Sequence, residues 1–191
     1  FMMLSQGLIM LCRVGAEVHV AQSLGKGDEK GASMYAETAM KLAIVLGLSY
    51  SFLGFLFSQQ FIDFFNISDP EVVTMGVQYM EIMVLSLPIM FINFLLIGIF
   101  NAGGYSDVPF LANAAGVVVK ISMSWSLING AFGLPALGVR GSALSTILAQ
   151  GTTFVILLLF LKKRKDEYLQ MNLLSPFRWE YAKRIVKVGG P

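Results

Sequence analysis

Long apolar runs without charge constrain this chain more than any other feature of its sequence. Three such runs extend from Lys41 to Asp63, from Glu81 to Asp107 and from Arg140 to Lys162. A helix needs about 20 mostly apolar residues to cross the hydrocarbon core of a bilayer, so each run predicts a membrane span. The composition agrees, because 55% of the residues are hydrophobic and only 14% are charged. We therefore expect a membrane protein rather than a soluble domain.

Two further segments are long enough to cross the membrane but carry ionisable residues. One contains Lys120 near its middle, and the other, at the start of the chain, contains Arg13, Glu17 and His19. With them, the sequence predicts an all-α, polytopic transmembrane helix bundle of five spans, at about 1–24, 34–58, 73–102, 109–131 and 140–161. An odd count of five suits part of a larger bundle.

The positions of Lys and Arg predict the orientation of the spans, because cytoplasmic loops are enriched in these residues. The segment 162–188 is strongly basic, whereas the loop from Gln59 to Glu71 carries three acids and no basic residue. The first is therefore expected in the cytoplasm and the second outside. Alternation then places loops 25–33 and 103–108 in the cytoplasm as well.

Two segments outside the spans have the composition of helices that lie along a membrane surface. Gln59 to Ile67 is aromatic and carries one acid, which predicts a short helix at the outer interface or the frayed end of the preceding span. Asn172 to Val188 mixes aromatic and basic residues, which favours an amphipathic helix at the inner surface over an irregular tail.

Lys120 is the first candidate for a functional site, because an ionisable group near the bilayer centre costs about 2.5–3.5 kcal/mol on insertion scales. Helical spacing puts Asn113, Gly116 and Ser124 on the same face as Lys120. This polar stripe must face protein or a cavity. Lys120 either takes part in transport or simply pairs with a carboxylate of a neighbouring helix, and the sequence favours neither.

The first predicted span holds a second set of polar candidates. Arg13 and Glu17 are four residues apart, so they are expected to neutralise each other, although both are also candidates for a cavity. His19 and Gln22 point to the opposite side of this helix. His19 can titrate near physiological pH, but a lone His near a helix end is more often a hydrogen-bonded structural residue.

Glu81 and Pro88 are candidates in the span 73–102. Proline frees a backbone carbonyl and bends a helix, so Pro88 near a buried acid is a candidate hinge. Glu81 is either such an acid or a residue close to the outer interface. Gly141, Ser145 and Ala149 form a row of small residues in the last span, which predicts close helix packing rather than ligand contact.

Several classes of function are not supported by the sequence. It contains no zinc-binding spacing, no glycine loop for phosphate and no nucleophile with a base, so we expect no enzyme activity, no metal site and no cofactor. The net charge of +2 gives no reason to expect nucleic acid as a partner.

Three motifs carry a resemblance to a known family. They are Val14 to Asp28 (VGAEVHVAQSLGKGD), Ile99 to Gly104 (IFNAGG) and Phe132 to Thr146 (FGLPALGVRGSALST). In their order and spacing these motifs resemble the amino-terminal lobe of the multidrug and toxic compound extrusion (MATE) family. The resemblance covers essentially the whole chain.

The resemblance implies that the five spans are helices two to six of a six-helix lobe. Residues 189–191 would then begin the second lobe, and the first helix and the second lobe would be partners missing from this chain. It also implies a multi-pass protein of a plasma membrane, with a bacterial inner membrane expected. Such a transporter exports amphipathic organic cations in exchange for H⁺ or Na⁺, between two lobes that alternate access.

One departure from the family pattern concerns the fifth helix. Many members have Asn and, four residues later, Asp or Asn as part of a cation site, and these positions are Lys120 and Ser124 here. An ammonium group repels a cation, so the resemblance implies an altered Na⁺ site in which Lys120 supplies a tethered positive charge. A salt bridge to an acid of the missing first helix would shift coupling elsewhere.

Two other functions remain open at this point. Lys120 and Arg13 would suit a flippase for lipid-linked oligosaccharide or peptidoglycan precursors, in which basic residues hold a pyrophosphate. A non-transporting truncated membrane protein is the third interpretation, which would be supported by the missing helix and lobe.

Overall fold

The computed structural model describes residues 2–64, 69–130, 136–164, 166–169 and 176–189. These residues form helices and connecting turns and contain no strand. In chain order the helices are α1 (Met2–Gly25), α2 (Glu29–Leu56), α3 (Ser58–Asp63), α4 (Pro70–Ala102), α5 (Asp107–Asn129), α6 (Val139–Lys163), the 3₁₀ turn η2 (Glu167–Leu169) and α7 (Trp179–Gly189).

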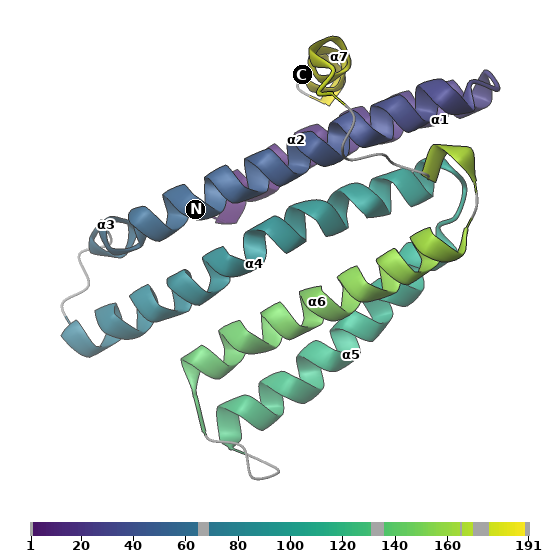
Figure 1. Cartoon of the computed structure of the whole chain (residues 1–191). Helices are drawn as coiled ribbons and strands as arrows, with labels where there is room; N and C mark the ends of the chain where they lie inside the picture. Colours follow the sequence, from purple (N-terminus) through teal and green to yellow (C-terminus); the bar gives the residue numbers. More distant parts are fainter. Residues whose placement is uncertain (1, 65–68, 131–135, 165, 170–175, 190–191) are drawn as a thin grey trace.

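The long helices lie roughly along one direction, whereas α7 is viewed end-on in the same picture and so crosses them (Figure 1). Helix α4 occupies the centre, with contacts to α1, α2 and α6. Its buried side chains include Phe91, Leu95 and Phe100. Helix α5 packs along α6 and touches α4 only slightly, so it forms the edge of the bundle.

Four helices, α2, α4, α5 and α6, are long and apolar enough to cross a membrane. The all-α, membrane-spanning fold predicted from the apolar runs is therefore confirmed. The helix ends lie within about five residues of the predicted spans. Helix α1 has the length of a span, but it is not among the four that satisfy both criteria. That α1 crosses the membrane stays a prediction.

Both predicted surface segments contain a helix in the structure. Helix α3 lies in the first, and residues 65–67 of that segment are outside the described residues. Helix α7 lies in the second, where it begins later than predicted; residues 172–175 are outside the described residues. Residues 132–135 of the third family motif are also outside them.

Local side chains explain where the helices begin and end. The Asp28 carboxylate accepts a hydrogen bond from the Gly31 amide at the start of α2. At the start of α4 the Asp69 carboxylate accepts one from the Glu71 amide, and Pro70 is the first residue of the helix. Gly130 ends α5 with a φ of +71°, a conformation that favours glycine. These caps set the loops that join α1 to α2 and α5 to α6.

Candidate transport site

The polar stripe predicted on α5 lies at the edge of the bundle. Lys120 and Asn113 are exposed and Ser124 is half-buried. Lys120 makes no ion pair with any residue that the structure describes, unlike Arg13, which pairs with Glu17. Since an uncompensated charge is costly inside a bilayer, this face of α5 requires water, a ligand or another polypeptide segment.

Gly116 differs from Lys120 in its burial, although the two residues are one helical turn apart on α5. It is buried against α6, where an added Cβ would overlap the Thr153 hydroxyl and lie 3.2 Å from the Ala149 carbonyl oxygen. The Thr153 hydroxyl donates a hydrogen bond to the Ala112 carbonyl at 3.3 Å. Gly116 therefore serves helix packing, and the polar stripe is reduced to Asn113, Lys120 and Ser124.

The small residues of α6 lie at the same helix contact. Gly141, Ser145 and Ala149 are all buried. An added Cβ at Gly141 would lie 2.7 Å from the Leu127 carbonyl oxygen, a distance that real Cβ atoms do not reach. The Ser145 hydroxyl bonds to the Ser142 carbonyl of its own helix and offers no free donor to a ligand. The row brings the backbones of α5 and α6 together.

Arg13 and Glu17 form an ion pair on α1, with 3.5 Å between Nε and Oε2. The pair packs against α4, where an added Cβ at Gly98 would lie 3.0 Å from Arg13 Cγ and 3.4 Å from Glu17 Oε2. The Arg13 guanidinium also lies 5.9 Å from the centre of the Phe94 ring. The charge of Arg13 is therefore compensated within the bundle, unlike that of Lys120.

His19 and Gln22 differ in their surroundings. Gln22 is exposed and has no described role in packing. His19 stacks on Tyr35, with ring centres 4.6 Å apart, and its Nε2 lies 3.2 Å from the Arg184 carbonyl oxygen. His19 is thus a hydrogen-bonded residue at the contact with α7, which is the structural role expected for a lone His.

Pro88 lies inside α4, where proline removes the hydrogen bond to the carbonyl four residues earlier. That carbonyl belongs to Val84, and it accepts a hydrogen bond of 2.9 Å from the Ser51 hydroxyl of α2. Gly47 allows α2 to approach closely, because an added Cβ there would lie 3.0 Å from Pro88 Cα. Nothing in the sequence pattern singled out Ser51 as the partner of this carbonyl.

Glu81 is half-buried, seven residues before Pro88 on α4. One turn earlier, Gln78 accepts a hydrogen bond of 2.6 Å from Arg140 at the start of α6. This bond links the ends of α4 and α6 on the side where Glu81 lies. The structure assigns no ion pair to Glu81 among the described residues.

Asn93 is a buried polar residue that was not among the candidates predicted from the sequence. Its Nδ2 donates to the backbone carbonyl of Gln150 at 2.9 Å and to the side-chain Oε1 of the same residue at 2.8 Å. This contact joins α4 to α6 in the middle of the bundle. A single uncharged amide gives no periodic pattern. The only signal for Asn93 in the sequence is a polar residue inside a long apolar run.

The linker after α6 is held against the end of α4. The Tyr168 hydroxyl lies where a Cβ at Gly103 would be, and burial raises the pKa of this phenol. Arg164 stacks on Tyr105, with its guanidinium carbon 3.5 Å from the ring centre. Because a side chain at position 103 would collide with Tyr168, Gly103 of the second family motif has a packing role.

The candidates from the sequence do not converge on one pocket within the described chain. A cavity of about 450 Å³ between α1 and α4 is lined by Glu17 but by none of the other candidates; its walls are Val14, Glu17, Val18, Ala21, Asn101 and Ala102. The described ranges also contain no group of three or more His, Cys, Asp or Glu that could hold a metal ion. Any site built on Lys120 must therefore be completed by groups outside these ranges.

Comparison with known proteins identifies relatives over nearly the whole chain. A "Probable multidrug resistance protein NorM" of Thermotoga maritima is 27% identical over 190 residues, which are 97% of this chain and 40% of that protein. "Multidrug resistance protein PmpM" of Pseudomonas aeruginosa is 28% identical over 178 residues, 90% of this chain and 36% of that protein. The chain thus spans about 40% of the length of the relatives it matches.

Solved structures show the same fold. "Crystal structure of MATE in the bent conformation" superposes with a TM-score of 0.88 at 23% identity, covering 98% of this chain and 41% of that one. A second structure has a TM-score of 0.85 at 24% identity and covers 97% of this chain and 40% of that one. This second structure is described as "Reverse polarity of binding pocket suggests different function of a MOP superfamily transporter from Pyrococcus furiosus Vc1 (DSM3638)".

Fold and comparisons together define a multi-pass membrane protein built as a helical bundle. The family model described as MatE matches residues 1–126, which is more than half of the chain. The chain belongs to this MatE (MATE) family, and the resemblance read from the three motifs is confirmed.

Proposed function

We propose that this chain supplies helices two to six of the amino-terminal lobe of a secondary active antiporter that exports amphipathic cationic compounds in exchange for H⁺ or Na⁺. Membership of the MatE family carries the proposal, supported by relatives named as multidrug resistance proteins. The protein would lie in a plasma membrane, with loops 25–33, 103–108 and 162–188 in the cytoplasm. No catalytic step and no cofactor is part of this function.

Transport of a fluorescent cationic dye tests the proposal directly. The complete transporter containing this lobe is expressed in cells, and the H⁺ and Na⁺ gradients are collapsed separately. Export that stops with one gradient identifies a cation-coupled antiporter and its ion. Export that continues without either gradient, or no export at all, contradicts the proposal.

Lys120 is proposed as a tethered cation on the substrate side of this lobe. It is exposed on a face of α5 that no described helix covers, and no described carboxylate compensates it. An ammonium group at that place would pair with an acid elsewhere in the transporter and displace cation coupling from this helix. Lys120→Asn is therefore expected to change the pH or sodium dependence of export, whereas Lys26→Asn, in the α1–α2 turn, is expected to leave it unchanged. Unchanged dependence in Lys120→Asn contradicts this role.

The same uncompensated lysine favours one second candidate, a flippase for lipid-linked pyrophosphates. Arg13 contributes little to this alternative, because Glu17 already pairs with it. The protein from Pyrococcus furiosus, described as having a binding pocket of reverse polarity, provides a precedent. Binding of a lipid pyrophosphate, measured against binding of a cationic dye, separates the two functions.

A further inference from the structure

Helix α7 has one side fixed to the bundle and one side free. Ala182 and Ile185 are buried beneath it, and an added Cβ at Gly15 of α1 would overlap the Ile185 carbonyl oxygen. Tyr181 meets Tyr35 edge-on, with ring centres 4.7 Å apart. A short helix held at this many points has a fixed rotation, so the identity of its outward residues is determined.

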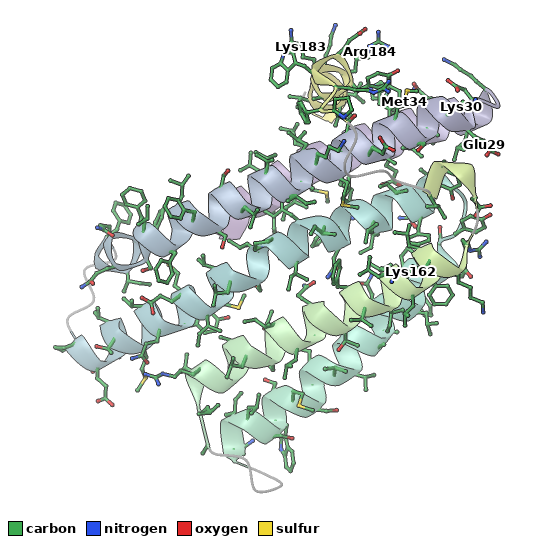
Figure 2. The ribbon with its side chains drawn as sticks, in the orientation of Figure 1. Glu29, Lys30, Met34, Lys162, Lys183 and Arg184 are labelled. Atoms are coloured by element: carbon green, nitrogen blue, oxygen red, sulfur yellow. The ribbon has the colours of Figure 1, made fainter. Side chains whose placement is uncertain are left out.

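The outward side of α7 is basic and bordered by aromatic residues. Lys183 projects from α7 away from the other helices (Figure 2), and Arg184 is exposed beside it although its guanidinium reaches Tyr35 of α2. Lys187 is exposed as well. Trp179 is 63% exposed, and the Lys183 ammonium lies 5.7 Å from the centre of its ring.

Internal partners account for only part of this charge. Arg184 pairs with Glu180 at 2.6 Å and donates to the Tyr35 hydroxyl at 3.4 Å. That hydrogen bond raises the pKa of the guanidinium, which stays charged. Lys183 and Lys187 make no ion pair with the described residues. Two lysines beside an exposed tryptophan thus form the free surface, which we call the α7 face: Trp179, Lys183 and Lys187.

The position of α7 along α1 places this face at the edge of the bilayer. Arg13 of α1 and Lys41 of α2 lie equally far from the turn that joins the two helices, and beyond Lys41 the chain is free of charge up to Asp63. At 1.5 Å of rise per residue both lie about 18 Å from the turn, and we take this common level, rather than the predicted span ends at residues 24 and 34, as the membrane boundary. Helix α7 crosses α1 there, with Ile185 against Gly15 and Gly189 against Leu11.

The orientation of α7 suits a membrane surface. It crosses the spanning helices (Figure 1), so it lies across the direction in which they traverse the bilayer. Amphipathic helices in this position place tryptophan at the acyl boundary and basic residues among headgroups. Each Lys or Arg near an anionic leaflet contributes about 1 kcal/mol of attraction.

We propose that the α7 face binds the headgroups of anionic phospholipids at the membrane boundary. The occupant is the lipid surface itself rather than an acidic protein, because the face combines free lysines with an exposed tryptophan at bilayer level. This inference does not depend on the transported substrate. It assigns to the linker after α6 a lipid contact that biases where α7, and with it α1, sits relative to the bilayer.

Tryptophan fluorescence provides the test. The protein with Trp179 as its only tryptophan, which in this chain requires Trp125→Phe, is placed in bilayers of phosphatidylglycerol and phosphatidylcholine. Either lipid is brominated in turn, because bromine quenches only a tryptophan that it contacts. Brominated phosphatidylglycerol is expected to quench Trp179 more strongly than brominated phosphatidylcholine at the same mole fraction.

A charge-neutralised variant identifies the groups responsible. Lys183→Gln with Lys187→Gln is expected to lower the preference for the anionic lipid, by up to about fivefold per lysine at 1 kcal/mol each. Lys26→Gln with Lys30→Gln removes the same charge from the α1–α2 turn and the first turn of α2, and is the matched control, in which the preference should persist. Thermal unfolding of each variant in phosphatidylcholine checks that it is folded.

Two results would overturn the proposal. Equal quenching by the two brominated lipids would show a lipid contact without charge selection. Absence of quenching by either lipid would show that protein covers the α7 face, in which case Trp179 should also be protected from aqueous acrylamide.

Discussion

The α5–α6 pair and the α1–α7 contact both bring backbones together at glycine, but the rest of their chemistry differs. Gly141 meets the Leu127 carbonyl in the first, and Gly15 meets the Ile185 carbonyl in the second. Around Gly141 the neighbouring hydroxyls bond within their own helix, whereas α7 also reaches α2, where Tyr181 meets Tyr35 edge-on and the Arg184 guanidinium donates to the Tyr35 hydroxyl.

The difference follows from the solvent on either side. Inside a bilayer apolar side chains gain little by leaving lipid, so close backbone approach is the main source of helix association. At the membrane boundary water is present, and burial of Ala182 and Ile185 contributes as it does in a soluble protein. The α5–α6 pair should therefore tolerate added volume least, and the α1–α7 contact should respond as a local, separable unit.

The largest effect is expected from Gly141→Leu. The new side chain collides with the backbone of Leu127, which cannot move without separating α5 from α6, and overpacking of this kind costs about 3 kcal/mol or more. Thermal unfolding in detergent measures the loss. Gly151→Leu on the same helix is the control, since nothing lies within 4 Å of an added Cβ there. Equal losses in the two variants would contradict close packing at Gly141.

A smaller, local effect is expected from Gly15→Ala. The added methyl group overlaps the Ile185 carbonyl, so α7 should detach at a cost of about 1–3 kcal/mol while the bundle stays folded. Trypsin cleavage at the lysines of α7 should accelerate by about tenfold for each 1.4 kcal/mol. Gly7→Ala, which meets nothing within 4 Å on the same helix, is the control. Unchanged cleavage would show that α7 is held elsewhere.

The smallest effect is expected from removing the Ser51 hydroxyl, which bonds to the Val84 carbonyl that Pro88 leaves without a helical donor. Ser51→Ala leaves the Val84 carbonyl without its donor and should cost about 1 kcal/mol, measured by unfolding in detergent. In a Pro88→Ala background the helix supplies its own amide to that carbonyl, so Ser51→Ala should then cost almost nothing. Ser49→Ala, at an exposed position of α2, is the control. Additive costs of the two substitutions would contradict the link between Ser51 and Pro88.

Much of the fold could be predicted because its signal is local. Apolar runs located α2, α4, α5 and α6, and spacing alone indicated the pair of Arg13 with Glu17. Aromatic and basic composition indicated a helix in the segment that contains α7. These features depend on residues that are close together in the chain.

Contacts between distant segments could not be predicted in the same way. His19 meets the backbone of Arg184, and Ser51 meets Val84; no periodicity links such positions. Helical spacing grouped Gly116 with Lys120 in the polar stripe. The structure shows that Gly116 instead allows close packing against α6, because it has no side chain. The candidate site stayed dispersed because Lys120 lies where no described helix covers it.

The hydrogen bond from Ser51 has a mechanical consequence for α4. A helix weakened at proline would ordinarily swing about that point independently of its neighbours. Here the acceptor left open by Pro88 is fastened to α2, and Gly47 seats α2 directly on the proline. Bending of α4 at Pro88 must therefore either move α2 with it or first break the hydrogen bond from Ser51. The motions of the two helices are coupled as long as that bond is formed.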